Sequence, residues 1–386
     1  MELRDAYIVA YGRSPYSRAR KGELANVHPV TIGGVTLKGV LAKIPQLKPE
    51  DIDDVIVGCA QPKGIQDTNM ARLISIRAGI PDSVPAMTVN RFCSSGSQTV
   101  ALACHAIMCG EAECIVAGGT ESMSLVNMYP DAGTEEKWVL EHDPGEYISM
   151  GETAENVAAD YHVARVDMER MACESHAKAA FAQEHGYFDD QIIPFDGEDR
   201  DGNHVYLDHD NGIRPETTME GLATLKPCFR PDGVVTAATS SQMTDGAGFV
   251  VVMSKEKMEE LGVKPVARFV GSAVKGVPSR IMGMGPAVAV PKVMALTGLT
   301  VDDMDVIELN EAFASQSLAC MELLHMDREK VNPDGGAMAL GHPLGASGAM
   351  LIVKALSRLK RTGGRYALIT MCIGGGQGFA GIFEMC

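Results

Sequence analysis

Residues 86–108 read AMTVNRFCSSGSQTVALACHAIM, a strand-like run followed by an almost uncharged run long enough for a buried helix. Ser94, Ser95 and Gly96 mark the join, because serine is a good helix N-cap and glycine permits a tight turn. Cys93 is therefore predicted to lie at or just before a helix N-terminus, where free N–H groups and the helix dipole favour an anion. Such a position can lower a thiol pKa from about 8.5 toward ~3.5–7.5. The alternative is a structural cysteine, since free cysteines usually pack as small apolar residues.

Segments before residue 120 alternate between two kinds of element. Strand-like runs cover residues 6–9, 54–57 and 114–117, and helix-like runs cover residues 33–45 and 70–78. Alternation of this kind predicts an α/β unit with a largely parallel sheet.

Residues 121–245 differ in composition from the segments on either side. Pro, Gly, Asp and His are scattered around a strongly helical run at residues 151–186. We expect an inserted segment, because long loop-rich insertions usually cover or bind a ligand. An insertion with a purely structural role is the alternative.

The second half of the chain repeats features of the first. LKPEDIDDVIV from Leu47 resembles LTVDDMDVIEL from Leu299, and CIVAGG from Cys114 matches ITMCIGG from Ile369. Internal similarity on this scale predicts two copies of one α/β unit packed together. YALITMCIGGG, from Tyr366, is expected to be the closing strand.

Length, charge and cysteine usage restrict the class of protein. A chain of 386 residues suggests two or three domains. Its net charge of −16 argues against a nucleic-acid surface, because binding phosphates in bulk needs a basic field. The ten cysteines include no CxxC pair, so free thiols are expected and a structural zinc site is not. No apolar run reaches the ~18 residues of a membrane helix and no signal-peptide pattern opens the chain, so we expect a cytoplasmic protein.

Four reactive or polar residues stand where a strand is predicted to end and a helix or glycine loop to begin: Cys93, Asn310, His342 and Cys372. Ligands bind at the carboxyl ends of strands in open α/β sheets, so the four are predicted to meet in one pocket. His342 is the only ionisable residue of GGAMALGHPLGASG (335–348) and is interpreted as a positioned base rather than a core histidine.

Cys372 precedes a glycine run at residues 374–376, whose amides can approach a developing oxyanion closely. A buried strand cysteine is the alternative for Cys372. Two cysteines and a histidine could also bind a metal, but they lack the usual paired spacing. Nucleophilic catalysis agrees better with these residues: one thiol activated by histidine attacks a carbonyl while a second thiol moves another proton. GQGFAG (376–381) matches a dinucleotide pattern, but too few residues follow it for the helix and second strand that the pattern needs.

Five motifs in order resemble those of the thiolases, over nearly the whole chain. They are VNRFCSSGSQ, GETAENVA, NEAFA, GGAMALGHPLGASG and CIGGGQG. The resemblance implies a five-layered αβαβα fold of two similar α/β halves with an inserted loop domain. The halves would be residues 1–120 plus 246–265 and residues 266–386, and the loop domain residues 121–245.

The resemblance also implies catalytic roles. Cys93 would become acylated, and His342 would take its proton and help to hold the thioester oxygen. Cys372 would be the acid/base on the α-carbon or on the incoming coenzyme A (CoA) thiol. Asn310 would hold a water that completes one oxyanion hole, and the amides of Cys93 and Gly374 would form the other.

CoA would be a co-substrate lying along the loop domain, with no permanently bound cofactor and no metal. Ser241 matches a family serine that contacts the pantetheine arm. Arg214, Lys226 and Arg230 are candidates for its phosphates, with ordinary solvated cations as the alternative. Thr239 and Asp334 stand where asparagine is common in the family, which puts local loop packing in doubt.

The predicted reaction is reversible thiolytic cleavage of 3-ketoacyl-CoA by CoA to acetyl-CoA and a shortened acyl-CoA. IRPETTMEGLATLKPCF and TAATSSQ resemble the degradative branch of the family. Alternatives are acetoacetyl-CoA synthesis from two acetyl-CoA molecules, a non-catalytic acyl-CoA-binding relative, and decarboxylative condensation with another group in place of Cys372. Homodimers or homotetramers, and a β-oxidation enzyme as a possible partner, follow from the resemblance alone.

Overall fold

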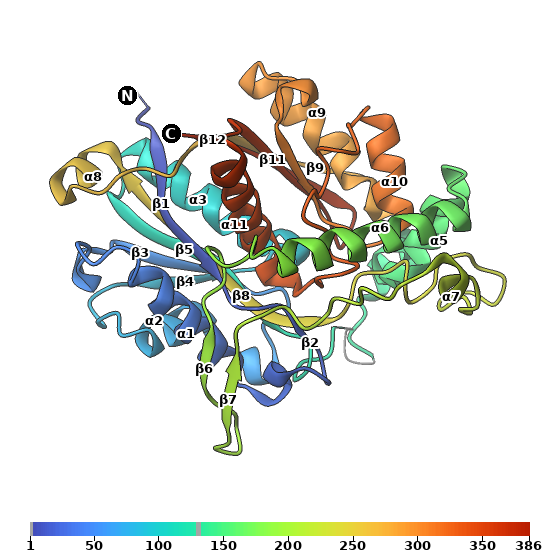
Figure 1. Ribbon diagram of the computed structural model, residues 1–386, viewed down its shortest axis with the longest axis horizontal. Helices are drawn as coiled ribbons and strands as arrows, with labels where there is room; N and C mark the ends of the chain where they lie inside the picture. The colour runs from blue at the N-terminus through green and yellow to red at the C-terminus, as the bar shows by residue number, and fades with distance from the viewer. Residues whose placement is uncertain (1–2, 129–132) are drawn as a thin grey trace.

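One mixed β-sheet runs through the computed structural model, which describes residues 3–128 and 133–386 (Figure 1). Residues 1–2 and 129–132 belong to the predicted first half and loop domain and lie outside the described residues. The strand order is β10-β11-β12-β9-β1-β8-β5-β3-β4, and β2 pairs with β8. The strands of this sheet are β1 (Ala6–Arg13), β2 (Ser17–Arg18), β3 (Asp54–Gly58), β4 (Ala86–Val89), β5 (Cys114–Ser122), β8 (Thr244–Ser254), β9 (Ala267–Gly276), β10 (Val306–Leu309), β11 (Tyr366–Ile373) and β12 (Gln377–Met385).

The sheet consists of two blocks that meet at β1 and β9. Only two residue pairs join these strands, Tyr7 with Arg268 and Ile8 with Ala267. Strands β1, β8, β5, β3 and β4 form one block, and β9, β12, β11 and β10 form the other. The segment that links them contains α8 (Lys255–Leu261).

Two long helices, α3 (Ser95–Cys109) and α11 (Leu344–Thr362), lie between the blocks (Figure 1). Ile115 and Ala117 of β5 and Ile369 of β11 pack into the core around these helices. The intervening strand residues face outward, as alternation along a strand requires. The outer layers are α1 (Pro29–Leu41) and α2 (Met70–Arg77) on one block, and α9 (Gly285–Thr297) and α10 (Ala314–Leu323) on the other. The predicted five-layered αβαβα fold is confirmed.

The internal repeat is visible in the structure. Each copy of the repeated motif forms a 3₁₀ turn, Pro49–Asp51 or Val301–Asp303, followed by a strand, β3 or β10. These strands pair in parallel with β5 and β11, which carry the second matched motif.

The predicted parallel pairing holds for the strands before residue 120 that pair with one another, whereas the sheet as a whole is mixed. Strands β3, β4 and β5 are parallel, as are β10 and β11, but β8 and β9 run antiparallel to β1. The strand from Tyr366 does not close the chain, since β12 follows it as a hairpin partner. Gly375 and Gly376 take φ values of 74° and 71°, a left-handed conformation that suits glycine and lets the chain reverse there.

Between β5 and β8 the chain forms a segment made mostly of helices and loops. Its elements are α4 (Lys137–His142), α5 (Met150–Asp160), α6 (Arg165–Glu184), α7 (Met219–Ala223) and a hairpin of β6 (Phe195–Glu198) and β7 (His204–Leu207). Arg13 of β1 and Asp210 of this segment form an ion pair of 2.7 Å with both side chains fully buried. Helices α5 and α6 pack against α10 of the other block. The inserted segment therefore contacts both halves of the fold.

Candidate active site

Cys93 lies just before α3, as the sequence predicts. A 3₁₀ turn, Phe92–Ser94, connects the end of β4 to this helix. Phe92 has φ of 42°, an uncommon backbone conformation for a side chain of this size. The turn is fixed locally, because Asn90 Oδ1 accepts the Phe92 N–H at 2.8 Å and Ser95 Oγ donates to the Phe92 carbonyl at 2.6 Å. Strained positions of this kind are common at functional sites.

The environment of the Cys93 thiol corrects one prediction. Burial raises the pKa of Cys93 to about 11, although the amides of Gly374 and Cys93 act in the opposite direction. The nearby carboxyl of Glu121 raises it further. The predicted lowering of this pKa is therefore wrong for the unliganded protein. The side chain is only 9% exposed, and losing water outweighs the amide contacts.

His342 lies in the loop that leads into α11. Its Nδ1 is 2.5 Å from Ser347 Oγ, and its Nε2 is 3.4 Å from Nδ2 of Asn310. Because the Asn310 amide is a donor, Nε2 accepts and Nδ1 carries the proton to Ser347. Burial lowers the pKa of His342 to about 4, so the imidazole is neutral at physiological pH. No strand directly precedes His342, contrary to the predicted strand-end position.

Asn310 directly follows β10, where the sequence placed it. Its N–H donates to the carbonyl of Thr370 in β11 at 3.0 Å. Asn332, with φ of 43°, binds the end of the same strand through both atoms of its carboxamide, 3.0 Å from the N–H and 2.8 Å from the carbonyl of Leu309. The strand end that presents Asn310 is thus fixed from two sides.

Cys372 lies in β11 and faces the outer core of its block, away from α3 and α11. Burial raises its pKa well above the ordinary value, and the thiols of Cys93 and Cys320 add to the effect. Cys93 and Cys372 are thus close enough to influence each other electrostatically. The Gly374 amide, two residues beyond Cys372, contacts the Cys93 sulfur. The Cys93 sulfur thus contacts the Gly374 amide and lies within electrostatic reach of Cys372.

Glycines allow the two central helices to touch at their N-terminal ends. A Cβ on Gly96 would lie 2.9 Å from the Gly345 carbonyl oxygen, and a Cβ on Gly348 would lie 2.4 Å from the Ser97 amide nitrogen. Such distances are shorter than real Cβ contacts, so glycine is required at both positions. This packing brings the 3₁₀ turn of Cys93 against α11, whose preceding loop carries His342.

The residues predicted to bind CoA have different environments. Ser241 is half-buried beside the NEAFA motif, and its N–H donates to the Ala312 carbonyl at 2.9 Å. Arg214 is half-buried, forms no ion pair with the described residues and has Arg18 nearby. Lys226 is exposed. Arg230 is instead paired with Glu152 at 2.7 Å and bonded to Asn156.

The two departures from the family pattern have local partners. Asp334 forms ion pairs with Arg358 at 2.8 Å and Arg361 at 2.5 Å, both on α11. Thr239 is buried, and its Oγ accepts the Thr236 N–H at 2.8 Å.

Sequence reasoning missed several residues that organise the site. Ser347 holds the His342 ring, and Glu121 and Glu311 are buried carboxylates beside the catalytic segments. An acidic residue inside a buried strand or within a motif was the available signal, since an isolated buried charge is costly. Their partners are backbone amides and side chains from distant segments, which the sequence does not identify.

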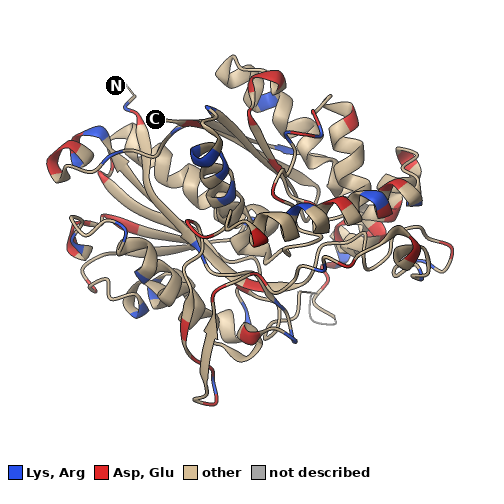
Figure 2. Ribbon diagram, viewed as in Figure 1, with Lys and Arg blue, Asp and Glu red and all other residues tan. Residues whose placement is uncertain are grey.

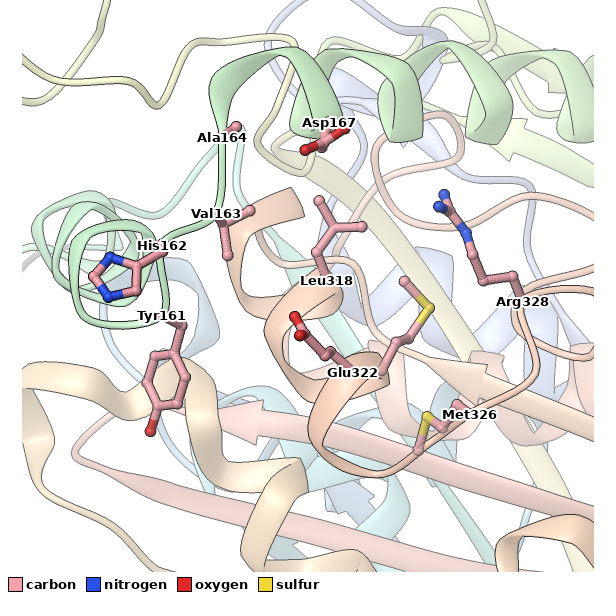
Figure 3. Close-up of a pocket in the computed structure, with 10 residues that line it drawn as sticks. Tyr161, His162, Val163, Ala164, Asp167, Leu318, Glu322, Met326 and Arg328 are labelled. Atoms are coloured by element: carbon pink, nitrogen blue, oxygen red, sulfur yellow. The ribbon is translucent and has the colours of Figure 1, made fainter.

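The structure also has a cavity outside the predicted catalytic site. A cavity of about 330 Å³ lies between the α5–α6 junction and α10, lined in part by His162, Asp167, Glu322 and Arg328 (Figure 3). None of the predicted catalytic residues lines it.

Figure 2 shows acidic and basic residues interspersed over the elements in view. Within residues 3–128 and 133–386, no group of three or more His, Cys, Asp or Glu is placed to hold a metal ion. No helix in these ranges is long and apolar enough to cross a membrane.

A buried thiol beside glycine amides, a neutral imidazole with a fixed tautomer and a second thiol are the parts of an acyl-transfer site. The fold and the site thus define an acyl-transferring enzyme. Residues 6–256 match the model of the thiolase N-terminal domain, and residues 263–385 match that of the thiolase C-terminal domain. The chain belongs to the thiolase family and is an acyltransferase.

Similar proteins cover the whole chain. The 3-ketoacyl-CoA thiolase of Bacillus subtilis (strain 168) is 44% identical over 392 residues, covering 100% of both chains. A beta-ketoadipyl-CoA thiolase of Acinetobacter baylyi is 42% identical over 400 residues, covering 99% of this chain and 100% of the relative. The crystal structure of the Bacillus anthracis acetyl-CoA acetyltransferase superimposes with a TM-score of 0.91 at 39% identity, covering 100% of both chains.

Proposed function

We propose that the protein cleaves 3-ketoacyl-CoA with CoA, through an acyl group carried on Cys93. The observation that carries this proposal is the contact of the Gly374 amide with the Cys93 sulfur. Cys372 is close enough to Cys93 to influence it electrostatically. His342, which is bonded to Asn310, lies in the loop that leads into α11. The amide can stabilise an oxyanion, and the neutral imidazole can accept the thiol proton.

The proposed first half-reaction breaks a carbon–carbon bond. The Cys93 sulfur attacks the 3-keto carbon while its proton passes to His342. The bond between C2 and C3 then breaks, leaving the acyl group on sulfur, and the C2 carbanion takes a proton from Cys372 and leaves as acetyl-CoA. The raised pKa of Cys372 supports this role, because a thiol that stays protonated can act as an acid.

The proposed second half-reaction transfers the acyl group. Deprotonated Cys372 accepts the proton of the incoming CoA thiol, and the CoA sulfur attacks the acyl-Cys93 carbonyl. The C–S bond to Cys93 breaks, and the Cys93 sulfur takes back its proton from His342. Both thiols are then protonated again, Cys93 by its own proton and Cys372 by the proton of the CoA thiol, and the products are acetyl-CoA and a shortened acyl-CoA.

Acylation of Cys93 is tested by mass spectrometry after mixing the protein with acetyl-CoA. We expect an acetyl adduct on Cys93 that is absent from Cys93→Ala. No adduct on the intact protein would refute the covalent route and favour the non-catalytic acyl-CoA-binding alternative.

The degradative direction is proposed on the names of relatives such as the 44% identical 3-ketoacyl-CoA thiolase. The alternative, acetoacetyl-CoA synthesis, is favoured by the likeness to the Bacillus anthracis crystal structure, which is that of an acetyl-CoA acetyltransferase. Steady-state rates on acetoacetyl-CoA and on 3-ketohexadecanoyl-CoA separate the two. Equal or better use of the short substrate would argue for the alternative.

We infer that the segment between β5 and β8, which makes up most of the predicted loop domain (residues 121–245), covers CoA, with Ser241 and Arg214 as its contacts. Arg214 supports this inference because it is a half-buried cation without an ion-pair partner in the described chain. Arg230 is less suited, since Glu152 already neutralises it. Arg214→Gln is expected to raise KM for CoA with little change in kcat, and an unchanged KM would exclude this contact.

We propose a homo-oligomer in the cytoplasm. Strand β4 is an open edge of the sheet, and its Met87 and the following Phe92 are exposed apolar residues, which supports pairing with a second copy. Light scattering after chromatography tests this pairing, and Met87→Asp should shift the protein toward monomer. All ten cysteines are free, which supports a reducing compartment.

A further inference from the structure

The loop that carries His342 is held at both ends by buried carboxylates, one from each half of the fold. Glu311 contacts the loop near Met338, and Glu121 contacts it at Gly345. We propose that Glu121 and Glu311 are positioning residues that fix the His342 imidazole for catalysis. This inference rests on the proposed function, in which His342 is the base.

Glu311 holds the beginning of the loop. Its Oε2 accepts the Met338 N–H at 3.1 Å and the Ser175 hydroxyl at 2.7 Å, and its Oε1 accepts from Asn332 Nδ2 at 2.9 Å. Ser175 Oγ in turn accepts the Gly336 N–H at 3.1 Å. Glu311 therefore joins the loop to α6 and to the asparagine that fixes the end of β10.

Glu121 holds the end of the loop from the opposite block. Its Oε2 accepts the N–H groups of Gly345 at 2.9 Å and Ala60 at 2.8 Å. Its Oε1 accepts Gln66 Nε2 at 2.6 Å and the Gln61 N–H at 3.3 Å. Gly345 lies in the first turn of α11, where a negative charge also stabilises the helix dipole.

Both carboxylates are enclosed, and the loop has glycine where they approach it. Glu121 is 1% exposed and Glu311 is 2% exposed. A Cβ on Gly336 would lie 2.2 Å from Glu311 Cδ, and a Cβ on Gly345 would lie 2.8 Å from Glu121 Oε2. Glycine at residues 336 and 345 thus leaves room for these two side chains.

Donors surround both carboxyl groups. Each oxygen of Glu121 and Glu311 meets N–H or O–H donors, which match the acceptor-only carboxylate form. Burial raises the pKa of Glu121, and its N–H partners offset this effect only in part. A carboxamide at either position would turn an NH₂ group toward donors and lose contacts that no other side chain replaces.

The two carboxylates differ in their electrostatic effect on the nucleophile. Glu121 raises the pKa of the Cys93 thiol, and Glu311 is not among the main groups that shift it. The other groups that face Cys93 are the Cys372 thiol of β11 and the amides of Gly374 and Cys93 itself. Cys59, at the end of β3, faces Glu121 at 3.8 Å. Loss of charge at residue 121 should therefore change the titration of Cys93, and loss of charge at residue 311 should not.

The test compares Glu121→Gln and Glu311→Gln in the full-length protein with Glu384→Gln as a matched control. Glu384 is a partly buried carboxylate that pairs with Arg268 and Arg365 at the far end of β12. Both loop variants are expected to lower kcat for thiolysis by on the order of 10²-fold, with KM changed by less than about twofold, because a misplaced catalytic group costs rate rather than binding. The control should behave as the unmodified protein. A folded loop variant with unchanged kcat would overturn the proposal.

Two further readouts do not depend on thiolase activity. The pH profile of Cys93 alkylation by iodoacetamide should move to lower pH in Glu121→Gln and stay unchanged in Glu311→Gln. The Nδ1–H proton of His342 should give an NMR signal in the unmodified protein that is lost in both variants. Two results would overturn the proposal: retention of that signal in both variants, or the same alkylation profile in Glu121→Gln and the unmodified protein. These results would count even if the unmodified protein forms no acetyl adduct. Failure of the adduct alone would refute only the proposed function.

A milder variant covers the case in which Glu311→Gln does not fold. Ser175→Ala removes one donor to Glu311 and the acceptor of the Gly336 N–H. It should lower kcat by about tenfold and weaken the His342 signal. Full kcat in folded Ser175→Ala would count against a positioning role of this end of the loop.

Discussion

Replacement of Gly348 by alanine tests whether contact between the two central helices sets the geometry of the site. The added Cβ would lie 2.4 Å from the Ser97 amide nitrogen and 2.6 Å from its Oγ, whereas ordinary contact begins at 3.4 Å. The two helix ends would have to separate by about 1 Å, the difference between these distances. Ser97 lies one turn beyond Cys93, and Gly348 lies in the first turns of the helix that follows His342.

Two consequences of this displacement can be estimated. Overpacking a well-packed interior costs about 1–3 kcal/mol, which lowers the midpoint of thermal unfolding. A misplacement of ~1 Å between reacting groups can cost on the order of 10²-fold in rate. We therefore expect Gly348→Ala to fold with reduced stability and to lose far more kcat than its stability change alone would explain.

The assay combines thermal unfolding with steady-state thiolysis of acetoacetyl-CoA at a temperature where the variant is folded. Gly221→Ala is the matched control, because Gly221 lies in helix α7 and its Cβ would have no neighbour closer than 3.4 Å. Its kcat should equal that of the unmodified protein. If folded Gly348→Ala keeps kcat within about twofold, helix separation does not control the site and the reasoning is wrong.

Asn310→Ala should lower kcat by ~10²–10³-fold in steady-state assays, because one donor beside the reacting oxygen is removed. Ser347→Ala should reduce kcat with little change in KM, since the His342 ring loses its Nδ1 partner. Alkylation of Cys93 in the unliganded protein should rise with pH toward about 11, the raised pKa of the thiol, and a plateau at neutral pH would contradict this value. The pKa of His342 is lowered from 6.5 to about 4, so below pH 6.5 the unfolded chain binds a proton that the folded protein does not. Urea unfolding should thus show that the free energy of unfolding falls by up to ~3 kcal/mol as the pH decreases from 6.5 to 4. The decrease should be smaller in His342→Gln.

The sequence was sufficient for the elements that depend on local pattern. The strand, turn and helix around Cys93 follow from a short apolar run, a Ser-Ser-Gly join and a longer apolar run. The repeat beginning at Leu47 and Leu299 correctly indicated two equivalent strands, because turn and strand are both encoded within about ten residues. Cys93, Asn310 and Cys372 all lie where these patterns placed them.

Properties set by distant contacts could not be obtained in this way. The pKa of Cys93 depends on how completely other segments exclude water from the sulfur, so the helix position alone gave the wrong direction. Strand β12 was missed because its glycine-rich start resembles a loop, and it forms through pairing with β9 and β11. Arg230 was predicted as a candidate to bind a phosphate, but the sequence could not show that it forms an ion pair with Glu152 in the folded protein.

The arrangement of the site explains why both halves of the fold are needed for the proposed reaction. Cys93 comes from one half, whereas Gly374, whose amide contacts its sulfur, comes from the other. The loop of His342 is likewise bound by Glu311 of its own half and by Glu121 of the opposite one. A shift of one block against the other would disturb the Gly374–Cys93 contact and the Glu121 contact together. Packing of α3 on α11 between the two blocks is therefore a condition for the proposed reaction as well as for stability.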